Sequence, residues 1–171
     1  MKYNLLLTGK PGVGKTTIII RLVEILKDKL RIGGFYTYEL RKNNIRTGFI
    51  IRTLDGKEAL LASKSFKSNY KVGKYSVNIK AIDNVMVPSI LESLEKDLII
   101  IDEIGKMELF SENFKTAVLK ALAKRKVLGT IMLKSNEFAS KIKARNDVKV
   151  ILVNEKNRDS LAEEIIKEIS P

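Results

Sequence analysis

A glycine-rich segment near the N-terminus has the residue types and spacing of a phosphate-binding loop. Residues 9–16 read GKPGVGKT and match G-x-x-x-x-G-K-[ST], the Walker A pattern, at every fixed position. Glycines let backbone N–H groups turn inward around an anion. Lys15 can reach the β- and γ-phosphates and take part in catalysis, and the Thr16 hydroxyl can ligate Mg²⁺. The residues predicted to bind the nucleotide here are Gly9, Lys10, Pro11, Gly12, Val13, Gly14, Lys15, Thr16 and Thr17.

A second motif, of the Walker B type, consists of an aliphatic run that ends in two acids. Residues 98–101 are Leu-Ile-Ile-Ile, and Asp102 and Glu103 follow directly. We expect Asp102 to help hold Mg²⁺ beside the nucleotide. Glu103 can face the γ-phosphate and orient or deprotonate a water, which is general-base catalysis of hydrolysis. Glu108, which follows the pliable Gly105, is the second candidate for this base.

The sequence contains neither histidine nor cysteine. Ser-His-Asp and Cys-His nucleophile systems, His-ligated metals and thiolate zinc sites are therefore excluded. General-base work falls to carboxylates, lysine or tyrosine. Any metal must be a hard cation on oxygen ligands, and we expect Mg²⁺ as the cofactor.

Hydrolysis also needs positive charge to offset the charge that develops on the γ-phosphate. The candidate cations are Arg41, Arg46, Lys106, Arg145 and Arg158. Each of them taken singly is more typical of an ordinary surface cation, so the sequence leaves this role open. Thr130 can instead sense the γ-phosphate from a strand that we expect between the strand before the loop and the strand that ends at Asp102.

The elements that position these motifs alternate between strand and helix. The predicted strands are 3–8, 98–101, 127–133 and 148–153, and the predicted helices are 15–30, 82–94, 114–123 with Ser111 as cap, 137–144 and 158–169. Aliphatic strands in such alternation favour an α/β fold with a mostly parallel, doubly wound sheet and right-handed crossovers. Together with the loop at residues 9–16, this pattern predicts the three-layer sandwich of P-loop NTPases.

Residues 35–78 interrupt the alternation. They contain β-rich runs at 35–40, 46–54, 59–62 and 72–78, with Asp55-Gly56 as a hairpin-type turn signal. We interpret the segment as a small antiparallel insertion, a flap beside the nucleotide, within a single domain that spans residues 1–171.

The charge of the chain is positive and uneven. The net charge is +12, and residues 41–80 hold ten basic residues against two acidic ones. Such a segment can attract phosphates or nucleic acid. Because no aromatic or Arg-rich RNA motif accompanies it, we interpret it as a solvated lysine-rich surface. No apolar run approaches the length of a membrane span, and no signal peptide is evident, so we expect a cytoplasmic protein.

Longer segments of the chain are specific to one family. They are TGKPGVGKTT (8–17), GGFYTYELR (33–41), RTGFIIRTLDG (46–56), VGKYSVN (72–78), LIIIDEIGKMELFS (98–111), LGTI (128–131) and DVKVILVNEKNR (147–158). In these segments the chain resembles the small P-loop nucleoside-triphosphatase family that includes the cancer-related nucleoside-triphosphatase.

The resemblance implies a Mg²⁺-dependent hydrolase that converts ATP, GTP and other nucleoside triphosphates to diphosphates with little base selectivity. It places phosphate binding on residues 9–16, and the metal and catalytic acids on Asp102 and Glu103. It also puts Arg41 and Arg46 at basic positions of the family's insertion, without fixing a role for them. We expect a monomer whose main partner is the nucleoside triphosphate.

Two other functions remain open at this level. A small nucleotide or metabolite kinase shares the size, the loop and the sheet, and the basic segment 41–80 could be its lid. A nucleotide-gated module that binds RNA or a protein partner would use the same basic segment differently. Glu103 and the run DEIGKMEL favour hydrolysis over the kinase.

Overall fold

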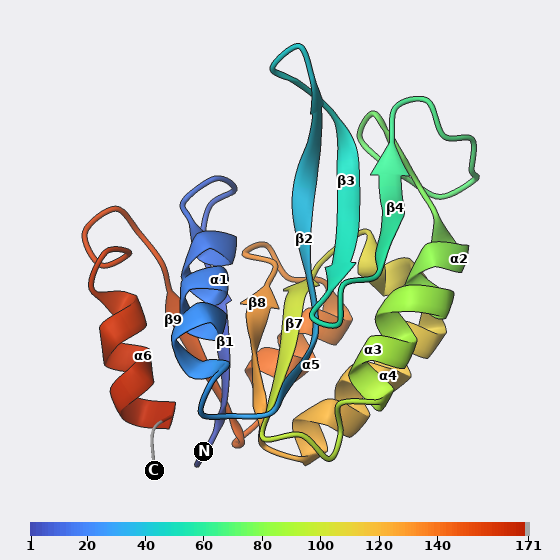
Figure 1. Ribbon diagram of the computed structural model, residues 1–171. Coiled ribbons are helices and arrows are strands. Elements are labelled where there is room, and N and C mark those ends of the chain that lie inside the picture. The colour runs from blue at the N-terminus through green and yellow to red at the C-terminus, as the bar shows by residue number, and fades with distance from the viewer. Residues whose placement is uncertain (170–171) are drawn as a thin grey trace.

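A computed structural model describes residues 1–169 of the chain as an α/β structure (Figure 1). The strands are β1 (Asn4–Thr8), β2 (Ile32–Lys42), β3 (Ile45–Thr53), β4 (Glu58–Ser63), β5 (Lys71–Val72), β6 (Tyr75–Val77), β7 (Leu98–Ile104), β8 (Val127–Ile131) and β9 (Val148–Leu152). The helices are α1 (Lys15–Leu26), α2 (Ile79–Ala81), α3 (Val87–Leu91), α4 (Glu112–Ala123), α5 (Glu137–Lys143) and α6 (Leu161–Ile169). A π-helical turn, η1 (Ile82–Met86), joins α2 to α3, and a 3₁₀ turn, η2 (Glu108–Phe110), follows β7.

One mixed sheet contains all nine strands of the described residues, in the order β5-β6-β4-β3-β2-β7-β8-β1-β9. The pairs from β2 to β9 are parallel, and those from β5 to β2 are antiparallel. As predicted, β8 lies between the strand before the loop and the strand that carries Asp102. The predicted α/β fold and the antiparallel pairing of residues 35–78 are confirmed, but the sheet is mixed and not mostly parallel, because antiparallel pairs make up half of its pairings.

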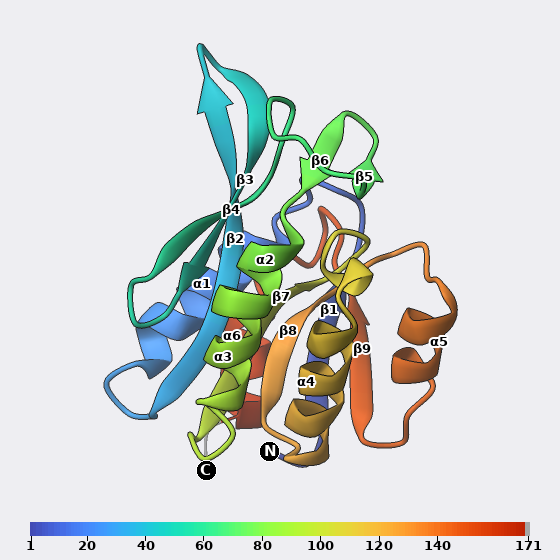
Figure 2. The same ribbon diagram turned by 90° about the vertical axis from the view of Figure 1, so that its right-hand side faces the viewer.

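Helices cover both faces of the parallel half (Figure 2). Successive side chains of a strand point to opposite faces, so Leu5 and Leu7 of β1 pack with α1 and α6, whereas Leu6 packs with the core under α3, α4 and α5. Strands that are buried on both faces need continuous aliphatic runs, which explains the composition of β1, β7 and β8. The loops at the carboxyl ends of these strands therefore rest on a rigid base.

The segment predicted as a small antiparallel insertion continues the sheet. Strand β2 pairs in parallel with β7 over Ile32–Phe35 and antiparallel with β3 from Phe35 to Lys42. The hairpin of β2 and β3 extends well beyond the ends of the central strands (Figure 1). Asp55-Gly56 lies in the turn between β3 and β4, as its sequence predicts. We refer to β3, β4, β5 and β6 with the outer part of β2 as the antiparallel arm.

Several boundaries differ from the predictions. The single strand predicted at 72–78 is a hairpin of β5 and β6, because Gly73 takes a left-handed φ of 57° and reverses the chain. The predicted helix at 82–94 begins at Ile79, where Asn78 caps it by accepting a hydrogen bond from the N–H of Ala81. The cap predicted at Ser111 is confirmed, since its Oγ accepts the N–H of Phe114 at 3.0 Å.

Two further boundaries change where site candidates lie. Strand β7 continues to Ile104, so Asp102 and Glu103 lie within the strand, at an irregularity of its pairing with β8. Helix α6 begins at Leu161 and not at Arg158, which leaves Arg158 in the loop between β9 and α6. Helix α1 ends at Leu26, four residues before the predicted end. None of the helices that the structure describes has the length and apolar character needed to cross a membrane.

The close pairing of β2 with β7 requires glycine at position 34. Gly34 has a φ of 104°, and a Cβ there would collide with the backbone of Ile100. Gly34→Ala should therefore lower the free energy of unfolding by about 3 kcal/mol or more, measured by urea denaturation.

Gly56→Ala is the matched control. Gly56 has a φ of 95°, but within the described structure nothing lies within 4 Å of its added Cβ, so it should cost only the backbone strain of about 1–2 kcal/mol. Equal losses in the two variants would contradict the packing argument.

Candidate functional site

The loop at residues 9–16 connects the buried strand β1 to helix α1 and packs closely on its neighbours. A Cβ at Gly9 would lie 2.6 Å from the carbonyl oxygen of Val153, so only glycine allows this approach. Gly14, with φ 108°, precedes α1, and among the described residues no side chain caps that helix. The first N–H groups of α1 and its dipole are therefore available to an anion.

Lys15 bends back over this loop. Its ammonium donates hydrogen bonds to the carbonyl oxygens of Gly9, at 2.9 Å, and Lys10, at 3.2 Å. The same positive charge lowers the pKa of both Asp102 and Glu103 relative to what burial alone would give. Lys15 thus lies between the loop and the two acids that the sequence assigns to the same site.

Asp102 is buried and is oriented by several donors. The Thr16 hydroxyl donates to its Oδ2 at 2.8 Å, and the Thr130 hydroxyl donates to its Oδ1 at 2.5 Å. Burial raises the pKa of Asp102, while the hydrogen bonds from Thr130, Thr16 and the backbone of Thr37 oppose that rise. The structure gives Thr130 a role that the sequence did not suggest, because its hydroxyl orients the Asp102 carboxyl.

Glu103 and Glu108 flank Gly105. A Cβ at Gly105 would collide with the Glu103 carboxyl and lie 3.0 Å from Oε2 of Glu108, so glycine lets the two acids approach. Burial, and then the charge of Asp102, raise the pKa of Glu103. Glu108 is only 4% exposed, and burial followed by the charge of Glu103 places its pKa well above the usual range. Three acids with raised pKa values therefore meet, and the charge of Lys15 acts on Asp102 and Glu103.

The donors present fit a Mg²⁺ ion that is shared with phosphates. The hydroxyl of Thr16 and the carboxyl of Asp102 are already within hydrogen-bonding distance of each other. Mg²⁺ commonly uses one or two protein oxygens and completes its octahedron with water and phosphate oxygens. Within residues 1–169, no group of three or more His, Cys, Asp or Glu side chains could hold a metal, which disfavours an all-protein cage.

Arg41 and Arg46 lie in the antiparallel arm and share a partner there. Both guanidinium groups pair with Glu39, at 2.5 Å for Arg41 and 3.0 Å for Arg46. The Nε of Arg46 also donates to the Tyr75 hydroxyl at 2.9 Å. The structure therefore places these two candidate cations in a network on β2, β3 and β6, and does not bring them to the carboxyl cluster.

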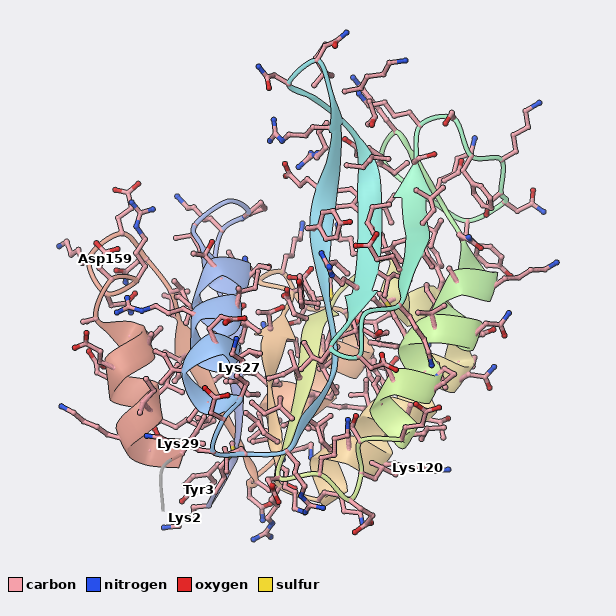
Figure 3. The ribbon with its side chains drawn as sticks, in the orientation of Figure 1. Lys2, Tyr3, Lys27, Lys29, Lys120 and Asp159 are labelled. Carbon is pink, nitrogen blue, oxygen red and sulfur yellow. The ribbon has the colours of Figure 1, made fainter. Side chains whose placement is uncertain are left out.

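The other candidate cations lie apart from one another. Arg145 pairs with Asp147 at 2.7 Å just before β9, at the opposite end of the parallel strands from the loop at residues 9–16. Arg158 lies in the loop after β9, 4.0 Å from the carboxyl of Asp159, which Figure 3 shows at the edge of the molecule. Lys106 is exposed and directly follows Gly105. Of these three, Lys106 lies nearest along the chain to the acids.

Comparison with known proteins places the chain in a family. Residues 4–166 match the model of the NTPase family. The chain belongs to this family. It is 51% identical over 165 residues to the nucleoside-triphosphatase THEP1 of Thermotoga sp. (strain RQ2), covering 95% of this chain and 93% of that protein. It is 40% identical to the nucleoside-triphosphatase THEP1 of Archaeoglobus fulgidus, covering 94% of each.

Solved structures of the family are similar over nearly the whole chain. The crystal structure of THEP1 from the hyperthermophile Aquifex aeolicus superposes with a TM-score of 0.88 and 35% identity, covering 98% of this chain and 99% of that one. The solution structure of a human cancer-related nucleoside triphosphatase gives a TM-score of 0.84 and 34% identity, covering 98% and 97%. The resemblance inferred from the sequence segments is confirmed.

Two contributions to the site were missed by sequence reasoning. Thr37 contacts Asp102 through its backbone, so its residue type carries no signal, and only the pairing of β2 with β7 brings it there. Gly105 was interpreted as a pliable turn residue, whereas its lack of a side chain makes room for two carboxyl groups. Asp102, Glu103, Lys15 and Thr16 are brought together as expected from their motifs.

The raised pKa of Glu108 predicts a pH-dependent stability. A carboxyl whose pKa is higher in the folded than in the unfolded state binds more protons when folded, so stability falls as the pH rises from the ordinary value of 4.5 toward the raised one. Glu108→Gln removes this loss. Its free energy of unfolding, relative to the parent protein, should therefore increase with pH by up to about 1.4 kcal/mol per unit.

Urea denaturation at a series of pH values measures this difference. Glu92→Gln, at an exposed position on the surface, is the control and should differ from the parent by the same small amount at every pH. A pH-independent difference for Glu108→Gln would show that this carboxyl is not held protonated by its surroundings.

Proposed function

We propose that this protein uses Mg²⁺ to hydrolyse nucleoside triphosphates to nucleoside diphosphate and phosphate, with little selectivity for the base. The observation that carries the proposal is the convergence of the loop at residues 9–16 with Asp102 through the Thr16 hydrogen bond, with Glu103 next in the same strand. The relatives with this fold are named as nucleoside-triphosphatases, which supports the reaction class. We accordingly assign the fold to the three-layer P-loop NTPases.

The triphosphate would lie against the loop formed by residues 9–17. Its backbone N–H groups and the uncapped start of α1 favour negative charge. Lys15 would exchange its two carbonyl partners for the β- and γ-phosphate oxygens, which are stronger, charged acceptors. A Cβ at Gly12 or Gly14 would meet nothing within 4 Å in the described structure, so the space beside these glycines is open.

Thr16 and Asp102 would hold the metal ion. When bound, Mg²⁺ supplies positive charge that neutralises the β- and γ-phosphates. The Thr130 hydroxyl keeps the Asp102 carboxyl in one orientation, and that carboxyl in turn fixes the Thr16 hydroxyl at the start of α1. This preorganisation lowers the cost of assembling the site when nucleotide arrives.

Glu103 is the base of choice. It would accept a proton from a water molecule as the water oxygen bonds to the γ-phosphorus and the bond to the β–γ bridging oxygen breaks, which leaves diphosphate and phosphate. Its pKa is raised toward neutral pH, where a general base is most effective, and Lys15 limits that rise. Glu108 has its pKa raised further and is more deeply buried, so it holds a proton and is the poorer base.

We propose that the protein is a single domain that acts as a cytoplasmic monomer. A kinase would need to hold a second substrate in line with the γ-phosphate as the phosphoryl acceptor. The Glu103 carboxyl, with its raised pKa, suits water as the acceptor instead. We therefore favour hydrolysis over phosphoryl transfer to a metabolite.

Phosphate release from ATP, GTP, CTP and UTP tests the proposed reaction. We expect comparable turnover of all four with Mg²⁺ and essentially none after chelation with EDTA, because Thr16 and Asp102 alone do not neutralise the phosphates. Lys15→Ala should abolish release and serves to exclude a contaminating phosphatase. A phosphorylated small molecule without free phosphate would overturn hydrolysis.

Substitution of the two candidate bases separates their roles. Glu103→Gln keeps size and polarity but cannot accept the proton, so kcat should fall by roughly 10²-fold or more while nucleotide binding persists. Glu108→Gln should lower kcat far less. The reverse order of effects, measured by phosphate release and by equilibrium nucleotide binding, would make Glu108 the base.

A further inference from the structure

Six exposed lysines gather where the β5–β6 hairpin and the loop before it meet the loops that follow β7 and β8. We define the lysine surface as Lys64, Lys67, Lys71, Lys74, Lys106 and Lys134. They line two adjoining cavities of about 680 and 510 Å³, which share Lys71 and Gly73. In the part of the chain that the structure describes, no acidic residue lines either cavity. The surface is therefore concave and uniformly positive.

The charge of this surface is not compensated by ion pairs. Some other surface lysines have acidic partners, as Lys115 does with Glu112 at 2.6 Å and Lys124 with Glu95 at 2.6 Å. Among residues 1–169, none of the six lysines forms a salt bridge. Uncompensated positive charge in a concavity concentrates anions and is the electrostatic signature of a nucleic-acid-binding face.

An exposed aromatic pair lies on the same surface. The rings of Tyr70 and Phe110 are 5.4 Å apart and tilted by 57°, and these residues are 46% and 38% exposed. Tyr70 belongs to the loop that carries Lys67 and Lys71, and Phe110 lines the second cavity. The sequence favours a solvated basic segment over a nucleic-acid site because it shows no aromatic motif beside the lysines. Phe110 of η2 is distant along the chain, and only the fold brings it to them.

We propose that the lysine surface binds single-stranded nucleic acid, with the phosphates on the lysines and a base stacked on Tyr70 and Phe110. A strand whose bases are unpaired can offer a ring face to an aromatic platform while its backbone follows a positive groove. In a duplex the bases are stacked on each other, so the aromatic pair would add nothing. The partner is thus distinguished by its chemistry from duplexes and from polyanions without bases.

This site is separate from the proposed catalytic one but lies beside it. Lys106 and Leu109 line the second cavity, and they lie on either side of Glu108 in the segment that follows Glu103. In Figure 2 the β5–β6 hairpin lies above the end of β7 and the turn η2. Binding of the polymer does not depend on the proposed hydrolysis, and it can be measured without any nucleoside triphosphate.

Fluorescence anisotropy with a labelled 12-nucleotide oligo(U) measures this binding, with the duplex of the same length as comparison. We expect tighter binding of the single strand, and a log–log slope of affinity against salt of about −2 to −4, since each phosphate contact with a single strand contributes about −0.7. Equal affinity for single strand and duplex, or no binding at low salt, would overturn the proposal.

Paired variants test the surface itself. The double substitution Lys67→Ala with Lys74→Ala should weaken binding by about tenfold or more and make the salt slope shallower. Lys29→Ala with Lys120→Ala removes the same charge at the other end of the molecule, where Figure 3 shows both residues, and should leave the affinity within about twofold. Equal effects of the two double variants would mean that affinity depends on the net charge of the protein and not on the lysine surface, which would overturn the proposal.

Stacking is tested at Tyr70. Tyr70→Ala should weaken oligo(U) binding by about tenfold, whereas Tyr70→Phe keeps the ring and should bind as the parent does. Neither variant should change the weak binding of inorganic polyphosphate, which has no bases. If Tyr70→Ala bound oligo(U) as well as the parent, or lost polyphosphate to the same extent, the surface would be a general polyanion site. Circular dichroism and thermal denaturation confirm that each variant is folded.

Discussion

The hydrogen bond from Thr16 to Asp102 is the contact on which the site depends, because it joins the start of α1 to the end of β7. The two residues are 86 positions apart in the sequence. They come within hydrogen-bonding distance because only one strand, β8, lies between β1 and β7 in the sheet. Thr130 projects from that intervening strand and holds the other carboxyl oxygen. The order of β1, β8 and β7 therefore brings the start of α1 to Asp102 and fixes the orientation of the Asp102 carboxyl.

The three acids share one buried environment. Burial is the first cause of the raised pKa of each, and the charge of Asp102 at Glu103, and of Glu103 at Glu108, raises the pKa further. The hydroxyl donors at Asp102, and the charge of Lys15 at Asp102 and Glu103, oppose this rise, whereas backbone hydrogen bonds oppose it at Glu108. The three carboxyls thus differ in the groups that act on them, and no histidine takes part.

How far the sequence predicts this arrangement depends on whether the information is local. Walker-type spacing around Lys15 and Asp102 identified the residues that meet, and the cap at Ser111 and the turn at Gly56 follow from local backbone chemistry. Contacts that require partners distant along the chain could not be foreseen, such as the backbone of Thr37 on Asp102, or Phe110 beside Tyr70. The hairpin at Gly73 was missed because alternating residues on both sides resemble one continuous strand.

Strand β2 gives the molecule a mechanical connection between its two halves. Its first residues are paired with β7 and its later residues, Thr37 among them, with β3, and the backbone of Thr37 contacts the carboxyl of Asp102. Because the arm is an extension of the sheet, a displacement of its strands is carried into β2. A force applied to the outer strands of the antiparallel arm would bend β2 and displace Thr37 relative to Asp102. The position of the antiparallel strands is thus mechanically coupled to the Asp102 carboxyl.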